Sequence, residues 1–203
     1  MLLKPKTMKV NTTIKFTKQL MLVMLMALSY NVLSAQEHYE LIKSDQHFVV
    51  KGTSSLHDWH MEAMDGQGEC QLIQADGTVN IQMAEVKFKA ESLKSGKNGM
   101  DKNAYKALKT KEFEWISFKL SAFEAKQGGK GIVTGNLTIA GFTKPVSFDV
   151  ETTQGAGSIT VSGTSAFKLT DFKVDPPTAL MGTIKTGDDV TVEFKLTFKN
   201  QNQ

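Results

Sequence analysis

Four residues with chemically active side chains, His57, Asp58, Trp59 and His60, stand together in the stretch GTSSLHDWHMEA of a chain that has only four histidines. Imidazole and carboxylate groups are ligands that zinc takes in proteins. In an extended strand, however, His57 and His60 point to opposite faces, and no HExxH or paired-cysteine spacing accompanies them. We therefore expect no metal or cofactor here. We interpret His57-Asp58-Trp59 as a bend that hydrogen-bonds backbone groups, with Trp59 packed under a barrel wall or lining its entrance.

Nucleophilic catalysis has little support in the sequence. Ser54, Ser55, His57 and Asp58 are neighbours along the chain, whereas catalytic triads are assembled by geometry, and no G-x-S-x-G elbow is present. Cys70 is the only cysteine, so no intramolecular disulfide can form. The surrounding GECQLI supplies no base, which favours a buried structural thiol.

The dominant hydrophobic period is two, which is typical of half-buried antiparallel strands. The row VTVEFKLTF places Val190, Val192, Phe194 and Leu196 on one face. Turn signals such as Asp76-Gly77 and Gly128-Gly129 separate several runs of this kind, and the spacing predicts an all-β sandwich or barrel. Residues 98–111 break the pattern. Their apolar residues fall on one face of a helix, so we expect one short helix between two strands.

The N-terminal residues have the pattern of a secretory signal peptide. Five lysines and no acidic residue precede an apolar run of nine, Leu20 to Leu28, and Ala35 follows a few residues later. A basic region, a short apolar region and a small residue at the cut are the usual signals, and the run is shorter than the roughly 20 residues that cross a membrane. We expect residues 1–35 to be a cleaved signal peptide and residues 36–203 to be one domain.

The charge balance gives no sign of a nucleic-acid partner. The whole chain has 24 basic and 21 acidic residues, but five of the lysines lie in the leader, which leaves 19 against 21. No arginine is present, and arginine is the preferred bidentate reader of phosphate. We expect a chain without nucleic-acid binding, whose basic isoelectric point belongs largely to its leader.

Three stretches carry a family resemblance over nearly all of the predicted domain. GNLTIAGFTKPVSFDV, residues 135–150, resembles the signature hairpin of the YceI-like family: a strand, a Gly turn, Thr-Lys-Pro-Val and a second strand. Residues 86–120 resemble the family's strand, helix and strand, and residues 165–198 its closing segment. In the hairpin, Gly141 permits the turn and Pro145, which has no N–H, suits a strand edge.

The resemblance implies an all-β, lipocalin-like extended antiparallel β-barrel with one short helix, located in the periplasm. It also implies an isoprenoid or quinone-like lipid inside the barrel, and it allows a homodimer. An apolar lining from the inward strand faces is then expected. Our candidates for ligand contact are Trp59, Val79, Ile81, Phe88, Leu93, Met100, Leu108, Phe113, Phe118, Leu137, Ile139, Phe148, Phe167, Phe172, Leu180 and Met181.

Alternatives from other functional classes stay open at this point. A solidly packed barrel without cargo would act as an interaction protein, and convergent polar groups inside a cavity would favour an enzyme of lipid or quinone metabolism. Small residues at Gly163, Ser165 and Ala166 hint at interior room. The segment PPTALMG, residues 176–182, is either a lid over one end or a strand connection, and we favour the connection.

Overall fold

A computed structural model describes residues 37–63, 65–75 and 77–201 of the chain. The predicted signal peptide and its cleavage site lie outside the described residues. Eleven strands form one sheet: β1 (Glu37–Ser54), β2 (Trp59–Ala63), β3 (Gly66–Ala75), β4 (Thr78–Lys89), β5 (Leu93–Lys94), β6 (Trp115–Ala125), β7 (Lys130–Ile139), β8 (Phe142–Gly155), β9 (Ser158–Lys168), β10 (Thr178–Ala179) and β11 (Ile184–Asn200).

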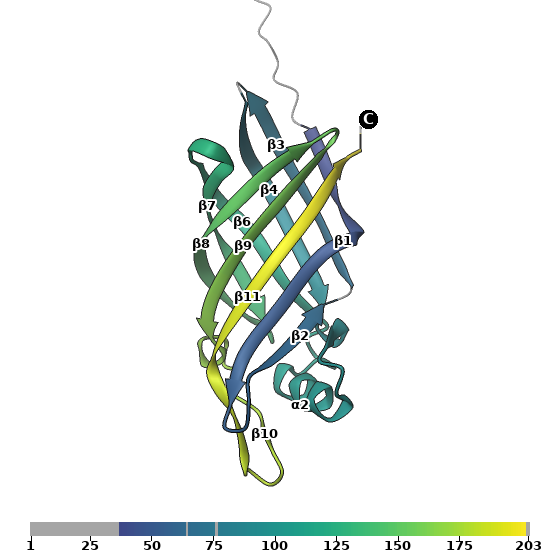
Figure 1. Cartoon of the computed structure of the whole chain (residues 1–203), viewed down its shortest axis with the longest axis vertical. Coiled ribbons are helices and arrows are strands. Elements are labelled where there is room, and N and C mark those ends of the chain that lie inside the picture. Colours follow the sequence, from purple (N-terminus) through teal and green to yellow (C-terminus); the bar gives the residue numbers. More distant parts are fainter. Residues whose placement is uncertain (1–36, 64, 76, 202–203) are drawn as a thin grey trace, which may run out of the picture. The chain divides into compact units, whose positions relative to one another are not determined.

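The sheet closes on itself into an antiparallel barrel (Figure 1). Eight strands follow one another around the wall in the order β1, β3, β4, β6, β7, β8, β9 and β11, and β11 then pairs with β1. The closing pair runs from Tyr39 opposite Asn200 to Ser54 opposite Thr186. The expected all-β barrel with one short helix is therefore confirmed.

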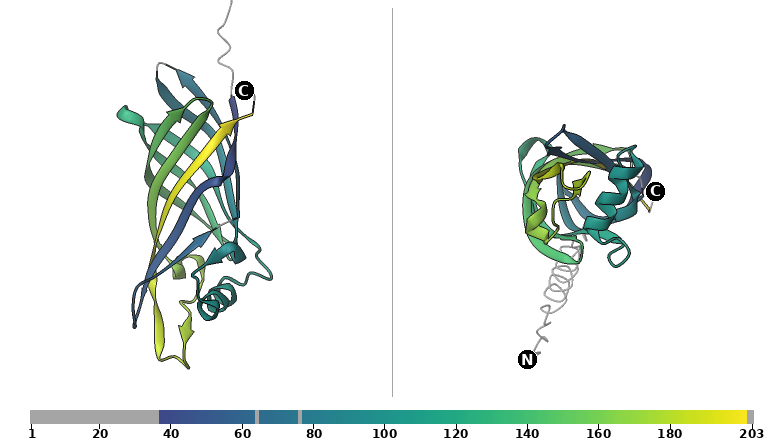
Figure 2. Two further views of the ribbon diagram at one scale, coloured as in Figure 1. Left: turned by 45° about the vertical axis from the view of Figure 1, so that its right-hand side comes forward. Right: turned by 90° about the horizontal axis from the view of Figure 1, so that it is seen from below.

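Four further segments gather at one end of the barrel, which we call the α2 end (Figure 2). They are α2 (Asn98–Leu108), the 3-10 turn η3 (Leu169–Phe172), the short strand β10, and the β1–β2 turn. Two more 3-10 turns, η1 (Ala90–Ser92) and η2 (Gln127–Gly129), complete the described elements. No helix in the described part of the chain is long and apolar enough to cross a bilayer.

The β7–β8 hairpin shows why its sequence is specific. Ala140 and Gly141 both have positive φ, 48° and 78°, so the strands are joined by a two-residue turn. A Cβ built on Gly141 would lie 2.4 Å from a ring carbon of Phe113. Both this contact and the positive φ exclude a side chain at this position. Pro145 falls where β8 pairs with β7 alone, because β9 joins β8 only from Val150 onward. The missing N–H of Pro145 therefore costs no ladder hydrogen bond.

The end opposite α2, which we call the closed end, holds several of the most buried side chains. Leu72 and Ile159 have no exposed surface and Tyr39 is 2% exposed. The Tyr39 hydroxyl donates a hydrogen bond to Glu37 Oε2 at 2.6 Å, and Asn200 Nδ2 donates to the same oxygen at 3.1 Å. Side chains from β1 and β11 are thus tied together where the two ends of the sheet meet.

Candidate functional site

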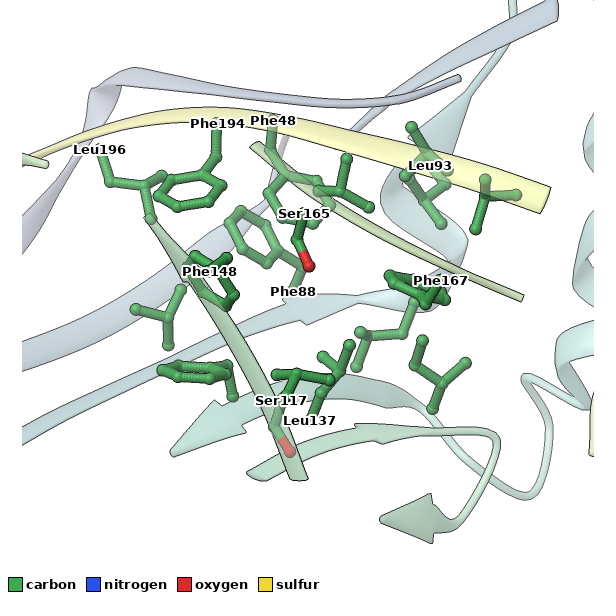
Figure 3. Close-up of a pocket in the computed structure, with 18 of the residues that line it drawn as sticks. Phe48, Phe88, Leu93, Ser117, Leu137, Phe148, Ser165, Phe167, Phe194 and Leu196 are labelled. Carbon is green, nitrogen blue, oxygen red and sulfur yellow. The ribbon is translucent and has the colours of Figure 1, made fainter. Parts of the chain in front are cut away.

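The barrel encloses an apolar cavity of about 210 Å³ that is lined from nearly every strand (Figure 3). An apolar cavity of about 150 Å³ already stays dry and accepts a benzene-sized molecule. None of the described residues that line the cavity is charged. Its lining includes hydroxyl-bearing side chains, Ser117, Ser165 and Thr186, among a large majority of aliphatic and aromatic ones. The site can therefore take an uncharged, largely hydrocarbon molecule.

Stacked and edge-on phenylalanine rings shape the interior. The rings of Phe48 and Phe88 stack with centroids 4.3 Å apart. Phe148 meets Phe118 at 5.7 Å and Phe194 at 5.6 Å. The two separations at Phe148 lie in the range where aromatic pairs attract beyond simple area burial. The rings form a connected apolar surface whose shape depends on a few side-chain rotamers.

Glycines in the wall allow two of these rings to lie close against the sheet. A Cβ on Gly135 would lie 2.3 Å from the ring of Phe118, and one on Gly163 would lie 2.9 Å from the ring of Phe194. Gly163 stands directly opposite Phe194 in the β9–β11 ladder. Because the rings occupy the space above glycine, they leave the centre of the barrel open. The interior room expected from Gly163 and Ser165 is present, whereas Ala166 is exposed and faces outward.

Helix α2 contributes Ala104, Ala107 and Leu108 to the lining. The apolar face expected on this helix is confirmed, since Met100, Ala104 and Leu108 pack against the main core. Two alanines at the cavity cover its end with little side-chain volume.

A buried aspartate fixes the entry into α2. Asp101 Oδ1 accepts hydrogen bonds from the backbone N of Ser95 at 2.8 Å and from its hydroxyl at 2.6 Å. Burial alone would raise the pKa of Asp101, but the two hydrogen bonds from Ser95 outweigh it and the pKa is lowered. At the other end of the helix, Thr110 Oγ1 donates to Glu91 Oε1 at 2.7 Å. The helix is held over the cavity at both ends.

Cys70 lies in the cavity wall, buried as expected. It is 2% exposed, and burial, aided by the nearby charge of Glu69, raises the pKa of its thiol to about 12. A thiol with this pKa is almost entirely protonated at neutral pH, so it acts as a small apolar side chain.

The stretch around His57 is a tight turn between β1 and β2. Ser54 Oγ donates to the carbonyl of His57 at 2.7 Å, and the His57 Nδ1 atom lies 2.6 Å from the carbonyl of Asp58. The described residues contain no group of three or more His, Cys, Asp or Glu side chains placed to hold a metal ion. These polar groups shape a turn, as the sequence interpretation predicts for His57.

Trp59 faces the cavity from this turn. Its indole covers Gly52, where an added Cβ would lie 2.3 Å from the ring, and its Nε1 donates to the carbonyl of Thr53 at 2.8 Å. The indole is thus fixed in one orientation. It lines the cavity near the α2 end.

Ten of the sixteen candidate contact residues line the cavity: Trp59, Ile81, Phe88, Leu93, Leu108, Phe118, Leu137, Ile139, Phe148 and Phe167. Their contact with a ligand stays a prediction.

The other six candidates do not line the cavity. Val79 packs in the closed end, and Met100 packs against the core beside the cavity. Phe113 covers Gly141, and Phe172 fills a second small core with its ring 5.1 Å from that of Phe167. Leu180 and Met181 are 72% and 106% exposed in the β10–β11 turn, so their assignment to the lining is wrong.

Several lining residues were not among the candidates. Phe48, Val192, Phe194 and Leu196 all face the cavity. The alternation of β11 contained this signal, since Val192, Phe194 and Leu196 fall on one predicted face. They were not among the candidates, because period two does not say which positions along an inward face border free space.

Comparison with known proteins identifies the family of this chain. The model of the YceI-like domain matches residues 30–198, which is most of the chain. This chain belongs to the YceI-like family. No curated protein sequence matches it.

Solved structures share the fold of this YceI-like chain at low identity. Burkholderia cenocepacia BcnA is 18% identical with a TM-score of 0.66, over 77% of this chain and 98% of that one. A polyisoprenoid binding domain from Saccharophagus degradans is 11% identical with a TM-score of 0.61, over 82% and 99%. The Campylobacter jejuni YceI protein is 21% identical with a TM-score of 0.54, over 68% and 85%.

Proposed function

We propose that this protein binds an isoprenoid or quinone-like lipid inside its barrel and stores or carries it in the periplasm. The cavity is the observation that supports the proposal, since the described residues lining it are uncharged and almost all apolar. Family membership and the fold shared with a polyisoprenoid binding domain agree with it. The leader-like residues 1–35 support secretion, which an N-terminal mass from the periplasmic fraction would test.

Burial of hydrocarbon is enough to drive such binding. Each methylene-sized group removed from water contributes roughly 0.8 kcal/mol, while association and chain ordering cost several kcal/mol. A carboxylate head group would lose its hydration without meeting a charged partner in the described lining, and burial of an unpaired charge is costly. The geometry therefore favours isoprenoid alcohols or quinones over fatty acids.

The same lining supports binding better than catalysis. Its reactive groups are hydroxyls and the protonated Cys70 thiol, and no His, Lys, Asp or Glu side chain accompanies them among the described lining residues. A general base within hydrogen-bond reach is needed to activate a hydroxyl. A filled core would have favoured a protein without lipid cargo. The described residues instead surround a cavity.

Tryptophan fluorescence tests the proposal, because the chain has two tryptophans in different settings. Trp59 lines the cavity, whereas the ring of Trp115 lies beneath the ammonium groups of Lys87 and Lys89 at 4.7 and 5.7 Å. Titration with a short isoprenoid alcohol is expected to give a saturable emission change that Trp59→Phe removes and Trp115→Phe retains. A signal that survives Trp59→Phe, or no saturable signal, would contradict the proposal.

A further inference from the structure

The β10–β11 turn carries two large apolar side chains into solvent at the α2 end. Gly182 N donates to the carbonyl of Ala179 at 3.1 Å, and the two residues between them have φ of 49° for Leu180 and 57° for Met181. The φ values of Leu180 and Met181 have the signs of a type I′ turn, at whose central positions Asn-Gly and similar pairs are strongly preferred, and Gly182 follows with a φ of 89°. Neither the backbone conformation nor the exposure of Leu180 and Met181 favours the isolated fold.

Leu56 is a third exposed apolar side chain at this end, in the β1–β2 turn. It is 66% exposed. The two turns are joined by reciprocal hydrogen bonds, from Ser55 N to the carbonyl of Lys185 at 2.9 Å and from Lys185 N to Ser55 Oγ at 3.1 Å. We call Leu56, Leu180 and Met181 the apolar tip. They are the large apolar side chains that stand out as exposed in the described part of the chain.

A basic segment lies at the same end of the barrel (Figure 2). Residues 94–111, which include α2, contain six lysines and a single acidic residue, Asp101, which is buried. Other carboxylates at this end are engaged: Asp171 pairs with Lys144 at 2.7 Å and Asp189 with Lys168 at 2.9 Å. Asp58 of the β1–β2 turn, Asp175 and Glu112 are exposed at this end too, so the excess of positive charge is confined to the α2 segment.

From the apolar tip and the basic segment together, we infer that the α2 end docks on the surface of a bilayer containing anionic phospholipid. Apolar side chains enter the boundary between head groups and acyl chains, and lysines attract the anionic head groups. The cavity lies beneath the same end, lined there by Trp59, Ala104 and Pro177. Docking would let an apolar molecule pass between membrane and barrel with little exposure to water. Docking of the α2 end on a bilayer does not depend on the proposed function, but the passage of an apolar molecule between membrane and barrel rests on it.

Vesicle co-sedimentation tests the inference, using the full chain and vesicles of phosphatidylcholine alone or mixed with phosphatidylglycerol. The wild type is expected to bind the mixed vesicles better. Leu180→Asn combined with Met181→Gly supplies the pair that a type I′ turn prefers, so the fold is retained while binding falls about tenfold. All variants share residues 1–36, so a difference in binding between two variants belongs to the substituted positions.

Matched charge variants complete the test. Lys102→Gln with Lys106→Gln, on α2, is expected to weaken binding to the mixed vesicles, whereas Lys130→Gln with Lys199→Gln, at the closed end, removes the same charge and leaves binding unchanged. Failure of the wild type to bind mixed vesicles, or equal binding by the turn variant, would overturn the inference and point to a protein partner for the tip. The Trp59 titration with a dissolved isoprenoid alcohol is read separately, so failure of the cavity proposal is distinguished from failure of docking.

Discussion

A single side chain can decide whether the cavity is open. Ser165 projects from β9 into the cavity, and its neighbour Thr164 is exposed on the outer face of the same strand. Ser165→Phe fills space that the ligand needs, so lipid uptake is expected to fall at least tenfold, with a stability change of about 1–3 kcal/mol from overpacking. Thr164→Phe adds the same volume outside and should leave uptake unchanged. Uptake by both variants at the wild-type level, measured by Trp59 fluorescence, would rule out this cavity as the site.

The reaction rate of the Cys70 thiol measures how well the cavity wall around it stays closed. With its pKa raised to about 12 by burial, the thiolate is scarce at pH 8. A charged disulfide reagent is therefore expected to react at least a hundredfold more slowly with the native protein than with the protein unfolded in guanidinium. Absorbance of the released thiol measures both rates. Similar rates in the two states would mean that the wall around Cys70 opens readily.

At the scale of elements, two glycines in different settings should respond oppositely to the same change. Gly141→Ala forces a Cβ into Phe113 at a φ of 78°, and about 1–3 kcal/mol of stability should be lost. Gly99 lies in α2 with open space around its Cα, so Gly99→Ala should gain about 0.5–1 kcal/mol. Chemical denaturation of both variants measures the differences. A loss at Gly99 or a gain at Gly141 would show that the turn and helix geometry is misassigned.

Most strands could be predicted from the sequence because alternation is a local property. The face of Val190, Val192 and Leu196 follows from it, the helix near residue 98 follows from a helical spacing of apolar residues, and the structure confirms both. The closing pair of β1 with β11 joins residues about 130 to 160 positions apart, from Ser54 opposite Thr186 to Tyr39 opposite Asn200, which no local pattern fixes. The positions of Leu180 and Met181 were missed because turn geometry, not hydrophobicity, directs those side chains outward.

At the scale of the whole molecule, the closure of the barrel should make stability fall at high pH. Burial, then the hydrogen bond to Glu37, raises the pKa of Tyr39 to about 12, above its ordinary value of 10.0. The folded state thus holds the phenol proton more tightly. Its contribution is fully present below about pH 10 and is lost as pH rises toward 12.

The pH dependence of unfolding measures this contribution. Tyr39→Phe keeps the ring and removes the titrating group, so the part of the loss between about pH 10 and 12 that belongs to Tyr39 should vanish. Cys70 titrates in the same direction, from 9.0 to about 12, and Cys70→Ser serves as the companion control. A wild-type protein whose free energy of unfolding is flat over this range would contradict the buried closure at Tyr39.

The measurement that tests lipid binding most directly is mass spectrometry of an organic extract from the protein purified under native conditions from the cells that produce it. We predict an isoprenoid or quinone-like lipid in near-stoichiometric amount, and its depletion from the Ser165→Phe variant but not from Thr164→Phe. A wild-type extract free of such lipid, and still free of it after the protein is incubated with a lipid mixture, would contradict the account.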